Sequence, residues 1–151
     1  MKISLISTSH RKNSQSKRIS NIFRNFILEI NDKIDLFEID AFDLKVPLWT
    51  SEKNENLNFW KTDYEIISSK LKLSDGFVFV VPEYGGMATP NAKNFFLIFN
   101  NGELFHKPGL IVSISSGNGG AYPISELRSS SYKNSHIMWI PENIIIRNVN
   151  H

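Results

Sequence analysis

The stretch of sequence that decides the fold is "GFVFVV", residues 76–81. It carries no charge and is rich in β-branched and aromatic side chains, as is typical of a central strand covered on both faces of a parallel sheet. Two further runs share this apolar character, "KISLIS" at 2–7 and "GLIVSIS" at 109–115. A period-two alternation at 33–40 and the run "HIMWI" at 136–140 complete the set of predicted strands.

Helical patterns separate these strands. In 16–30, apolar residues recur at the spacing of one helix face, and 57–73 shows a second helical pattern. Pro90 fits the first turn of a third helix that ends near residue 99, and a weaker helix is expected over 121–132. Since strands that alternate with helices are joined by right-handed crossovers, the sequence predicts a doubly wound, three-layer α/β fold with a five-stranded parallel sheet.

The composition is that of a globular domain. The chain has 151 residues, 41% of them hydrophobic and 21% charged, so we expect a single domain over residues 1–151. The net charge of +2 is scattered, which favours neither nucleic acid nor a membrane surface as a partner. The absence of cysteine excludes disulfides and thiolate metal sites. It fits a reducing compartment, and we expect a cytoplasmic protein.

Three chemically unusual loops, 7–16, 81–90 and 115–122, follow the carboxyl ends of predicted strands. In an open parallel sheet, ligands bind at this edge. The first loop precedes a helix and contains Arg11 and five hydroxyl side chains, those of Ser7, Thr8, Ser9, Ser14 and Ser16. Free N–H groups at a helix N-terminus, a cation and hydroxyl donors together suit a phosphate.

A simpler interpretation of the first loop is that Asn13 or Ser14 only caps the helix, and the residues alone leave both interpretations open. The loop lacks the glycine spacing of a dinucleotide or Walker loop, so a phosphomonoester fits better. In the second loop, Gly85 and Gly86 permit positive φ angles and the close approach of a planar ligand, or form an ordinary tight turn. The glycines of the third loop can present N–H donors to an anionic or carbonyl edge.

These motifs together resemble the NAD(P)H-dependent FMN reductase family of flavodoxin-like proteins. The first loop is similar to the family's Ser-Arg-Ser pattern, and Pro82-Glu83-Tyr84 is similar to its Pro-Glu-Tyr signature. The family's further motifs follow in order at Lys93-Asn94, "HKP" (106–108), the Ser-Gly-Gly-rich loop 115–120 and Leu127-Arg128. The resemblance covers about residues 1 to 140.

The resemblance implies FMN and NAD(P)H as cofactors and a flavodoxin-like fold. The FMN phosphate would be held by Ser9, Arg11, Ser14 and Ser16. The residues implied beside the isoalloxazine ring are Pro82, Glu83, Tyr84, Gly85 and Gly86, and those implied near its pyrimidine end are Ser115, Gly117, Gly119 and Gly120. Hydride would pass from nicotinamide to flavin and on to a quinone, an azo compound, free flavin or a similar small acceptor, so no catalytic side chain is required.

The sequence departs from the family pattern at several positions. Thr8 stands where relatives usually have glycine, and Gly85 where they often have asparagine. The chain ends at His151, where relatives continue into a further helix, so we expect the last helix to be short or missing. Either a neighbouring subunit covers that face or the polypeptide is incomplete. The isoleucine run within 141–150 suggests an interface in a homodimer or homotetramer.

The main alternative is a non-enzymatic flavodoxin-type electron carrier or flavin-binding regulatory protein. Flavodoxins tend to be strongly acidic, and the pI of about 8.8 argues against that version. The dispersed histidines, His10, His106, His136 and His151, predict no metal site. The sequence contains no Gly-x-Ser-x-Gly motif, which argues against a serine hydrolase.

Overall fold

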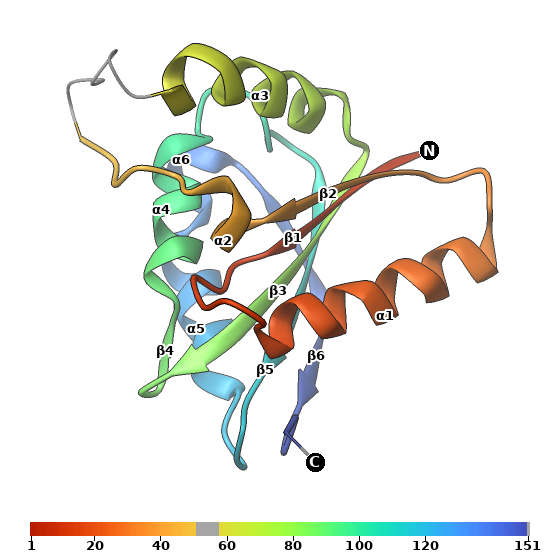
Figure 1. Ribbon diagram of the computed structural model, residues 1–151, viewed down its shortest axis with the longest axis vertical. Helices are drawn as coiled ribbons and strands as arrows, with labels where there is room; N and C mark the ends of the chain where they lie inside the picture. Colours follow the sequence, from red (N-terminus) through yellow and green to blue (C-terminus); the bar gives the residue numbers. More distant parts are fainter. Residues whose placement is uncertain (51–57, 151) are drawn as a thin grey trace.

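The computed structural model describes residues 1–50 and 58–150 and is built around one parallel sheet (Figure 1). Its parallel strands follow the order β2-β1-β3-β5-β6. These strands are β1 (Lys2–Ser7), β2 (Asp35–Asp40), β3 (Gly76–Tyr84), β5 (Pro108–Ile114) and β6 (Met138–Ile146). A short strand, β4 (Met87–Ala88), pairs antiparallel with the end of β3. The predicted five-stranded parallel sheet is therefore confirmed.

Helices cover both faces of the sheet, which gives the three predicted layers (Figure 1). They are α1 (Gln15–Ile30), α2 (Ala41–Leu44), the π-helix η1 (Phe59–Asp63), α3 (Tyr64–Leu73), α4 (Pro90–Ile98), α5 (Ala121–Ser130) and α6 (Tyr132–Ser135). The larger core cluster joins the sheet to α3, α4 and α5. The smaller cluster joins the opposite face to Ile19 of α1.

Strand β3 is buried on both faces, as its sequence predicts. Phe77, Phe79 and Val81 belong to the larger cluster, whereas Val78 and Val80 belong to the smaller one. The larger cluster is rich in aromatic rings, and Phe79 contacts the rings of Phe95, Phe96 and Trp139. This packing fixes β3 in the centre of the sheet, so that its carboxyl end lies between those of β1 and β5.

Three features of the fold differ from the sequence prediction. Strand β3 extends to Tyr84 and pairs with β4, so most of the loop expected at 81–90 is strand and hairpin. Strand β6 continues beyond the predicted 136–140 into the isoleucine run, where Ile144, Ile145 and Ile146 pair with β5, and the interface expected there stays a prediction. Helix α2 was not predicted, because its four residues show no apolar periodicity. It begins after Asp40, whose carboxylate accepts the Phe42 N–H at 2.9 Å.

The second predicted helix starts within the part of the chain that the structure leaves out, since Leu57 lies outside the described residues. Its described part is η1 followed by α3. The third helix begins at Pro90 as predicted, and Thr89 caps it by accepting the Ala92 N–H at 3.2 Å. Residues 147–150, which follow β6, form a turn and no helix.

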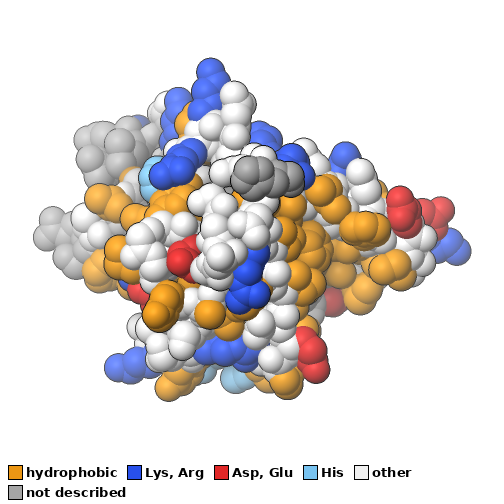
Figure 2. Space-filling model, turned by 90° about the horizontal axis from the view of Figure 1, so that it is seen from below, with side chains coloured by type: hydrophobic (Ala, Val, Ile, Leu, Met, Phe, Trp, Pro, Cys, Tyr) orange, Lys and Arg blue, Asp and Glu red, His pale blue; other side chains and the backbone are white. Residues whose placement is uncertain are grey.

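The face covered by α1 keeps a broad apolar surface, which Figure 2 shows from below. Ile22, Phe26 and Ile30 of α1 are exposed, as is Ile144 of β6. Within 1–50 and 58–150, no helix is both long and apolar enough to cross a bilayer.

Candidate functional site

A groove of about 500 Å³ lies at the carboxyl ends of the central strands. We call it the carboxyl-edge groove. Four segments form its walls: the loop before α1 with the start of that helix, the end of β3 with its hairpin turn, the end of β5 with the loop after it, and the chain after β6. The lining residues are Arg11, Lys12, Asn13, Ser14, Gln15, Ser16, Pro82, Glu83, Tyr84, Gly85, Ile114, Ser116, Val149 and Asn150. This is the edge at which the sequence places the ligand.

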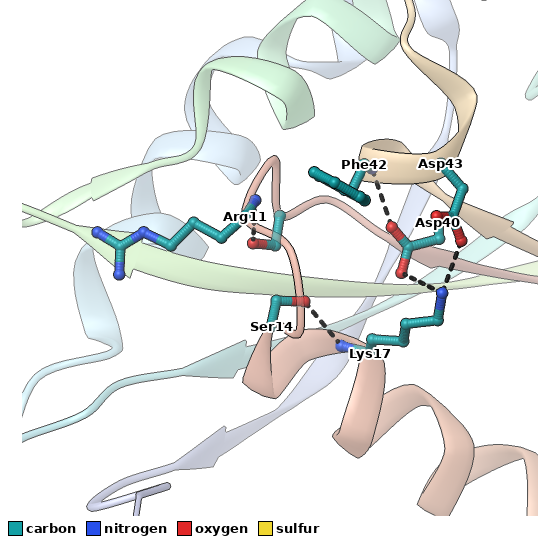
Figure 3. A network of polar contacts seen from close by, with 7 residues as sticks. Arg11, Ser14, Lys17, Asp40, Phe42 and Asp43 are labelled. Carbon is teal, nitrogen blue, oxygen red and sulfur yellow. Dashed lines mark hydrogen bonds and ion pairs between the residues drawn. The ribbon is translucent and has the colours of Figure 1, made fainter.

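A second hollow of about 600 Å³ follows the outer edge of β2, between α1 and α3. Its charged groups are largely paired with one another: the Lys17 ammonium contacts the Asp43 carboxylate at 2.6 Å and that of Asp40 at 3.8 Å. Figure 3 shows this network on one side of the loop before α1 and the Arg11 side chain pointing to the other. No glycine of the loops after β3 and β5 lines this second hollow, whereas Gly85 lines the carboxyl-edge groove, which is therefore the better candidate.

The N-terminus of α1 supplies the polar end of the carboxyl-edge groove. The Ser14 hydroxyl caps the helix by accepting the Lys17 N–H at 3.2 Å, so the capping interpretation is correct for Ser14 (Figure 3). The Ser16 hydroxyl is different, because it is buried and has no hydrogen-bond partner among the described residues. A buried hydroxyl without a partner at the positive end of a helix dipole is suited to an anionic oxygen.

Ser9 lies behind the wall of the groove. It is fully buried, and its hydroxyl forms a hydrogen bond with the Tyr84 hydroxyl at 2.7 Å and accepts the Arg11 N–H at 3.1 Å. The Arg11 guanidinium lies over the other side of the wall, 4.2 Å from the centroid of the Tyr84 ring. Ser9 and Arg11 therefore hold Tyr84 from two directions, and of these three only Arg11 and Tyr84 line the groove.

The turn between β3 and β4 needs both of its glycines. Gly85 and Gly86 have φ angles of 58° and 77°, a conformation that residues with a Cβ rarely adopt. Glu126 holds the hairpin by accepting the Ala88 N–H at 2.7 Å and pairing with Lys93. Burial disfavours the ionised Glu126 carboxyl, but these two hydrogen bonds outweigh it and lower its pKa.

Other residues of the family-like motifs stabilise the framework. The Asn94 side chain donates to the Pro47 carbonyl and accepts the Trp49 N–H, both at 2.8 Å. The Lys107 ammonium donates to backbone carbonyls at the end of α3, and burial lowers its pKa. Arg128 donates to the Ile140 carbonyl at 2.6 Å. These motifs therefore position the groove without lining it.

The glycine loop 115–120 is held beside the groove by its neighbours. The Glu83 carboxylate accepts the Gly120 N–H, and a Cβ placed on Gly119 would lie 2.5 Å from Oε1 of Glu83. Gly120 has a φ of 101°, and a Cβ there would lie 2.6 Å from Cγ2 of Ile145. The predicted residues that stand outside the groove lining are Ser9, Gly86, Ser115, Gly117, Gly119 and Gly120.

Sequence analysis missed the wall formed by Val149 and Asn150. The chain after β6 turns back so that the Val149 N–H donates to the Ser115 carbonyl at 3.1 Å. Arg18 of α1 secures it by donating to the Val149 carbonyl at 2.6 Å. No local pattern signals this return, because both partners are distant in sequence. The sequence prediction also missed other lining residues, most of which lie within or beside the predicted loops. They are Lys12, Asn13, Gln15, Ile114 and Ser116.

The groove has the chemistry of a site for a planar, phosphorylated ligand. One end offers a helix N-terminus, a free buried hydroxyl and cationic side chains, and the other offers an aromatic ring and a backbone turn without side chains. No His, Cys, Asp or Glu cluster suited to a metal ion occurs in the described part of the chain. The lining contains no histidine or cysteine that would form a nucleophile and base pair.

Comparisons with known proteins agree with this geometry. The sequence model of the family described as NADPH-dependent FMN reductase matches residues 1–151. No curated protein gives a significant match.

Several solved structures of similar fold are oxidoreductases. An oxidoreductase from Corynebacterium diphtheriae superposes with a TM-score of 0.78 at 16% identity, over 99% of this chain and 83% of that one. An azoreductase from Bacillus anthracis gives a TM-score of 0.72 at 13% identity, over 99% of this chain and 88% of that one. The flavoenzyme NAD(P)H:(acceptor) oxidoreductase from Paracoccus denitrificans gives 0.71 at 15% identity, over 94% of this chain and 77% of that one. These likenesses support the flavodoxin-like fold.

Proposed function

This chain belongs to the NADPH-dependent FMN reductase family, enzymes whose cofactors are FMN and NAD(P)H, and we propose that it holds FMN in the carboxyl-edge groove and passes electrons from NAD(P)H to a small acceptor. Quinones, azo compounds and free flavin are the acceptor classes that we propose. FMN, when bound, supplies the hydride-accepting and electron-donating chemistry, so the protein has to bind and orient its ligands and needs no nucleophile.

The observation that carries the proposal is the Ser16 hydroxyl. It is buried at the first turn of α1, lines the groove and has no partner among the described residues. An unpartnered buried hydroxyl is unfavourable unless a ligand or water satisfies it. We assign it to the phosphate of FMN, together with the N–H groups of the first turn of α1. Arg11 and Lys12 also line the groove and add positive charge.

The ring system would lie against the end of β3. Pro82 is the last buried residue of the strand, Glu83 follows it half-buried, and Gly85 exposes backbone where a side chain would otherwise stand. Tyr84 is held from behind by Ser9, so this wall is organised before any ligand binds. Loop 115–120 would face the pyrimidine end, where N–H donors stabilise the negative charge that reduction creates.

Equilibrium binding of FMN and riboflavin tests the phosphate assignment. We expect FMN to bind at least about tenfold more tightly than riboflavin, because only FMN engages the end of the groove formed by α1. Equal affinities would remove the phosphate from this site. Oxidation of NADH and NADPH should then be measured with a quinone, an azo dye and free FMN. If NAD(P)H reduces the bound flavin but none of the three acceptors sustains turnover, the proposed acceptor classes are wrong.

We also propose that the enzyme is a cytoplasmic homodimer or homotetramer. The support for an assembly is the exposed apolar surface of α1, which contains Ile22, Phe26 and Ile30. Light scattering coupled to size exclusion should give a mass of two or four chains, and Phe26→Glu should lower it. A single-chain mass at micromolar concentration would contradict the proposed assembly.

A further inference from the structure

We propose that Glu83 and Arg147 are positioning residues that clamp one peptide group of the glycine loop, the one joining Gly119 to Gly120, and thereby set the affinity and reduction potential of the flavin. The inference about flavin rests on the proposed function. The clamp itself is a property of this chain and has its own test.

The anionic side of the clamp is Glu83. This residue is half-buried at the end of β3, lines the carboxyl-edge groove, and accepts the Gly120 N–H through Oε2. The carboxylate fits closely over the preceding glycine: the three atoms nearest to a Cβ built on Gly119 all belong to Glu83, at 2.5 to 2.9 Å. A side chain at position 119 would therefore displace the Glu83 carboxylate from this place.

The cationic side is Arg147, the first residue after β6. Its Nε donates to the Gly119 carbonyl at 3.0 Å and to the Asn118 carbonyl at 2.8 Å. The neighbouring Asn148 N–H donates to the Gly117 carbonyl at 3.0 Å, which ties the same segment to the loop at a second point. Arg147 thus reaches the loop from the chain that follows β6, whereas Glu83 reaches it from β3.

Both charges act on the same peptide group. The carbonyl of Gly119 faces the guanidinium and the N–H of Gly120 faces the carboxylate, so each end of the peptide dipole meets the charge that stabilises it. A peptide between two glycines has little intrinsic preference for one orientation, because glycine adopts positive and negative φ about equally well. Turning this peptide over would place its carbonyl against Glu83, so the two charges select one orientation.

The clamp connects to the groove through Glu83 and Ser116, which both line it. A loop held in one orientation presents its N–H groups without reorganisation when negative charge develops on a ligand. Glu83 also places a negative charge at the groove, which disfavours reduction of a nearby flavin. Replacing that charge while keeping a hydrogen-bond acceptor, as in Glu83→Gln, should raise the midpoint potential of bound FMN.

Hydrogen exchange of the Gly120 amide tests the clamp in the protein without flavin. Glu83→Ala and Arg147→Met should each accelerate exchange at Gly120 by about tenfold, since each removes one charged partner of the peptide. Arg24→Met is the matched control, because Arg24 pairs with Glu38 at 3.8 Å on the exposed surface of α1 and β2. Unchanged exchange at Gly120 in both clamp variants would overturn the proposal, whether or not the protein binds FMN.

FMN affinity provides a double-mutant cycle. The single variants Glu83→Ala and Arg147→Met should each weaken binding about tenfold. The double variant should also lose about tenfold and not about a hundredfold, because both partners act on one peptide group. Additive losses would show that the two residues act separately.

Gly119→Ala provides a second cycle through a different atom. The added methyl group meets the Glu83 carboxylate, so it should weaken FMN binding as Glu83→Ala does. In the Glu83→Ala background the same change should have no further effect, and a further loss would contradict the assigned contact. If Glu83→Ala does not fold, Glu83→Gln replaces it in the binding measurements, because glutamine keeps a hydrogen-bond acceptor for the Gly120 N–H. An unshifted midpoint potential in Glu83→Gln would remove Glu83 from control of the flavin.

If the wild-type protein itself binds no FMN, the proposed function fails while the exchange measurement still decides the clamp.

Discussion

The Ser9 hydroxyl lies 2.7 Å from the Tyr84 hydroxyl and joins the loop after β1 to the end of β3. Ser9 is fully buried and also accepts the Arg11 N–H, so this contact fixes the relative positions of two of the segments that form the groove. The polar end and the aromatic wall are therefore organised together before a ligand binds.

Loss of the Ser9–Tyr84 hydrogen bond should weaken both the fold and FMN binding. We expect Ser9→Ala and Tyr84→Phe each to lower the free energy of unfolding by about 1 kcal/mol. The double variant should have the same free energy of unfolding, measured in urea, as the less stable of the two single variants. Tyr132→Phe changes an exposed tyrosine and is the control. Additive destabilisation would mean that the two hydroxyls do not stabilise each other.

Ser16→Ala should separate stability from binding. The hydroxyl has no partner among the described residues, so its removal should leave the apoprotein as stable or slightly more stable. FMN affinity should fall by about 1 to 2 kcal/mol, because the phosphate loses a donor. Ser20→Ala is a matched control: Ser20 is a buried hydroxyl on the same helix without a described partner, and it lies outside the groove lining. Equal FMN affinity in both variants would exclude Ser16 from the site.

Arg11→Ala should weaken FMN binding by about 1.5 to 3 kcal/mol if its guanidinium forms a charge-assisted bond to phosphate. Riboflavin affinity should change much less, because riboflavin lacks the phosphate. In the structure the guanidinium lies 4.2 Å from the Tyr84 ring centroid, so it can also act by supporting that ring. Equal losses for FMN and riboflavin would instead assign Arg11 to the support of Tyr84.

The Glu126 carboxylate should make hairpin stability depend on pH. Its hydrogen bonds to Lys93 and the Ala88 N–H lower its pKa in the folded state below that in the unfolded chain. The carboxylate therefore stabilises the fold above its unfolded pKa, and this contribution is lost as pH falls through the lower, folded pKa. Glu126→Gln should cost about 1 kcal/mol at neutral pH and nothing in acid, measured as unfolding free energy. A pH-independent difference between the two proteins would contradict this assignment.

The sheet could be predicted because its signals are local. The run 76–81 is apolar throughout, and the structure buries it on both faces with Phe79 at the centre of an aromatic cluster. The positive φ angles of Gly85 and Gly86 were likewise expected, since tight turns need residues without a Cβ. Loop positions at the carboxyl edge follow from the topology alone.

The detailed roles within the site could not be predicted, because they depend on contacts between distant segments. Ser9 stands in a phosphate-binding pattern, yet its hydroxyl turns to Tyr84, a choice set by the packing of β1 against β3. The sequence places Glu83 only through its motif, beside the flavin ring, whereas the structure shows its carboxylate accepting the Gly120 N–H. Val149 lines the groove because Arg18 and Ser115 hold it there, and no local pattern encodes that return.

Anaerobic reduction of the FMN-loaded protein by NADPH or NADH tests the central claim most directly. The account predicts that the wild-type protein binds FMN stoichiometrically and that one of the two nucleotides bleaches the flavin absorbance, with Ser20→Ala behaving as wild type and Ser16→Ala requiring more FMN for loading. Flavin that binds but stays oxidised in the presence of both nucleotides would contradict the assignment of this groove as the site of an NAD(P)H-dependent reductase.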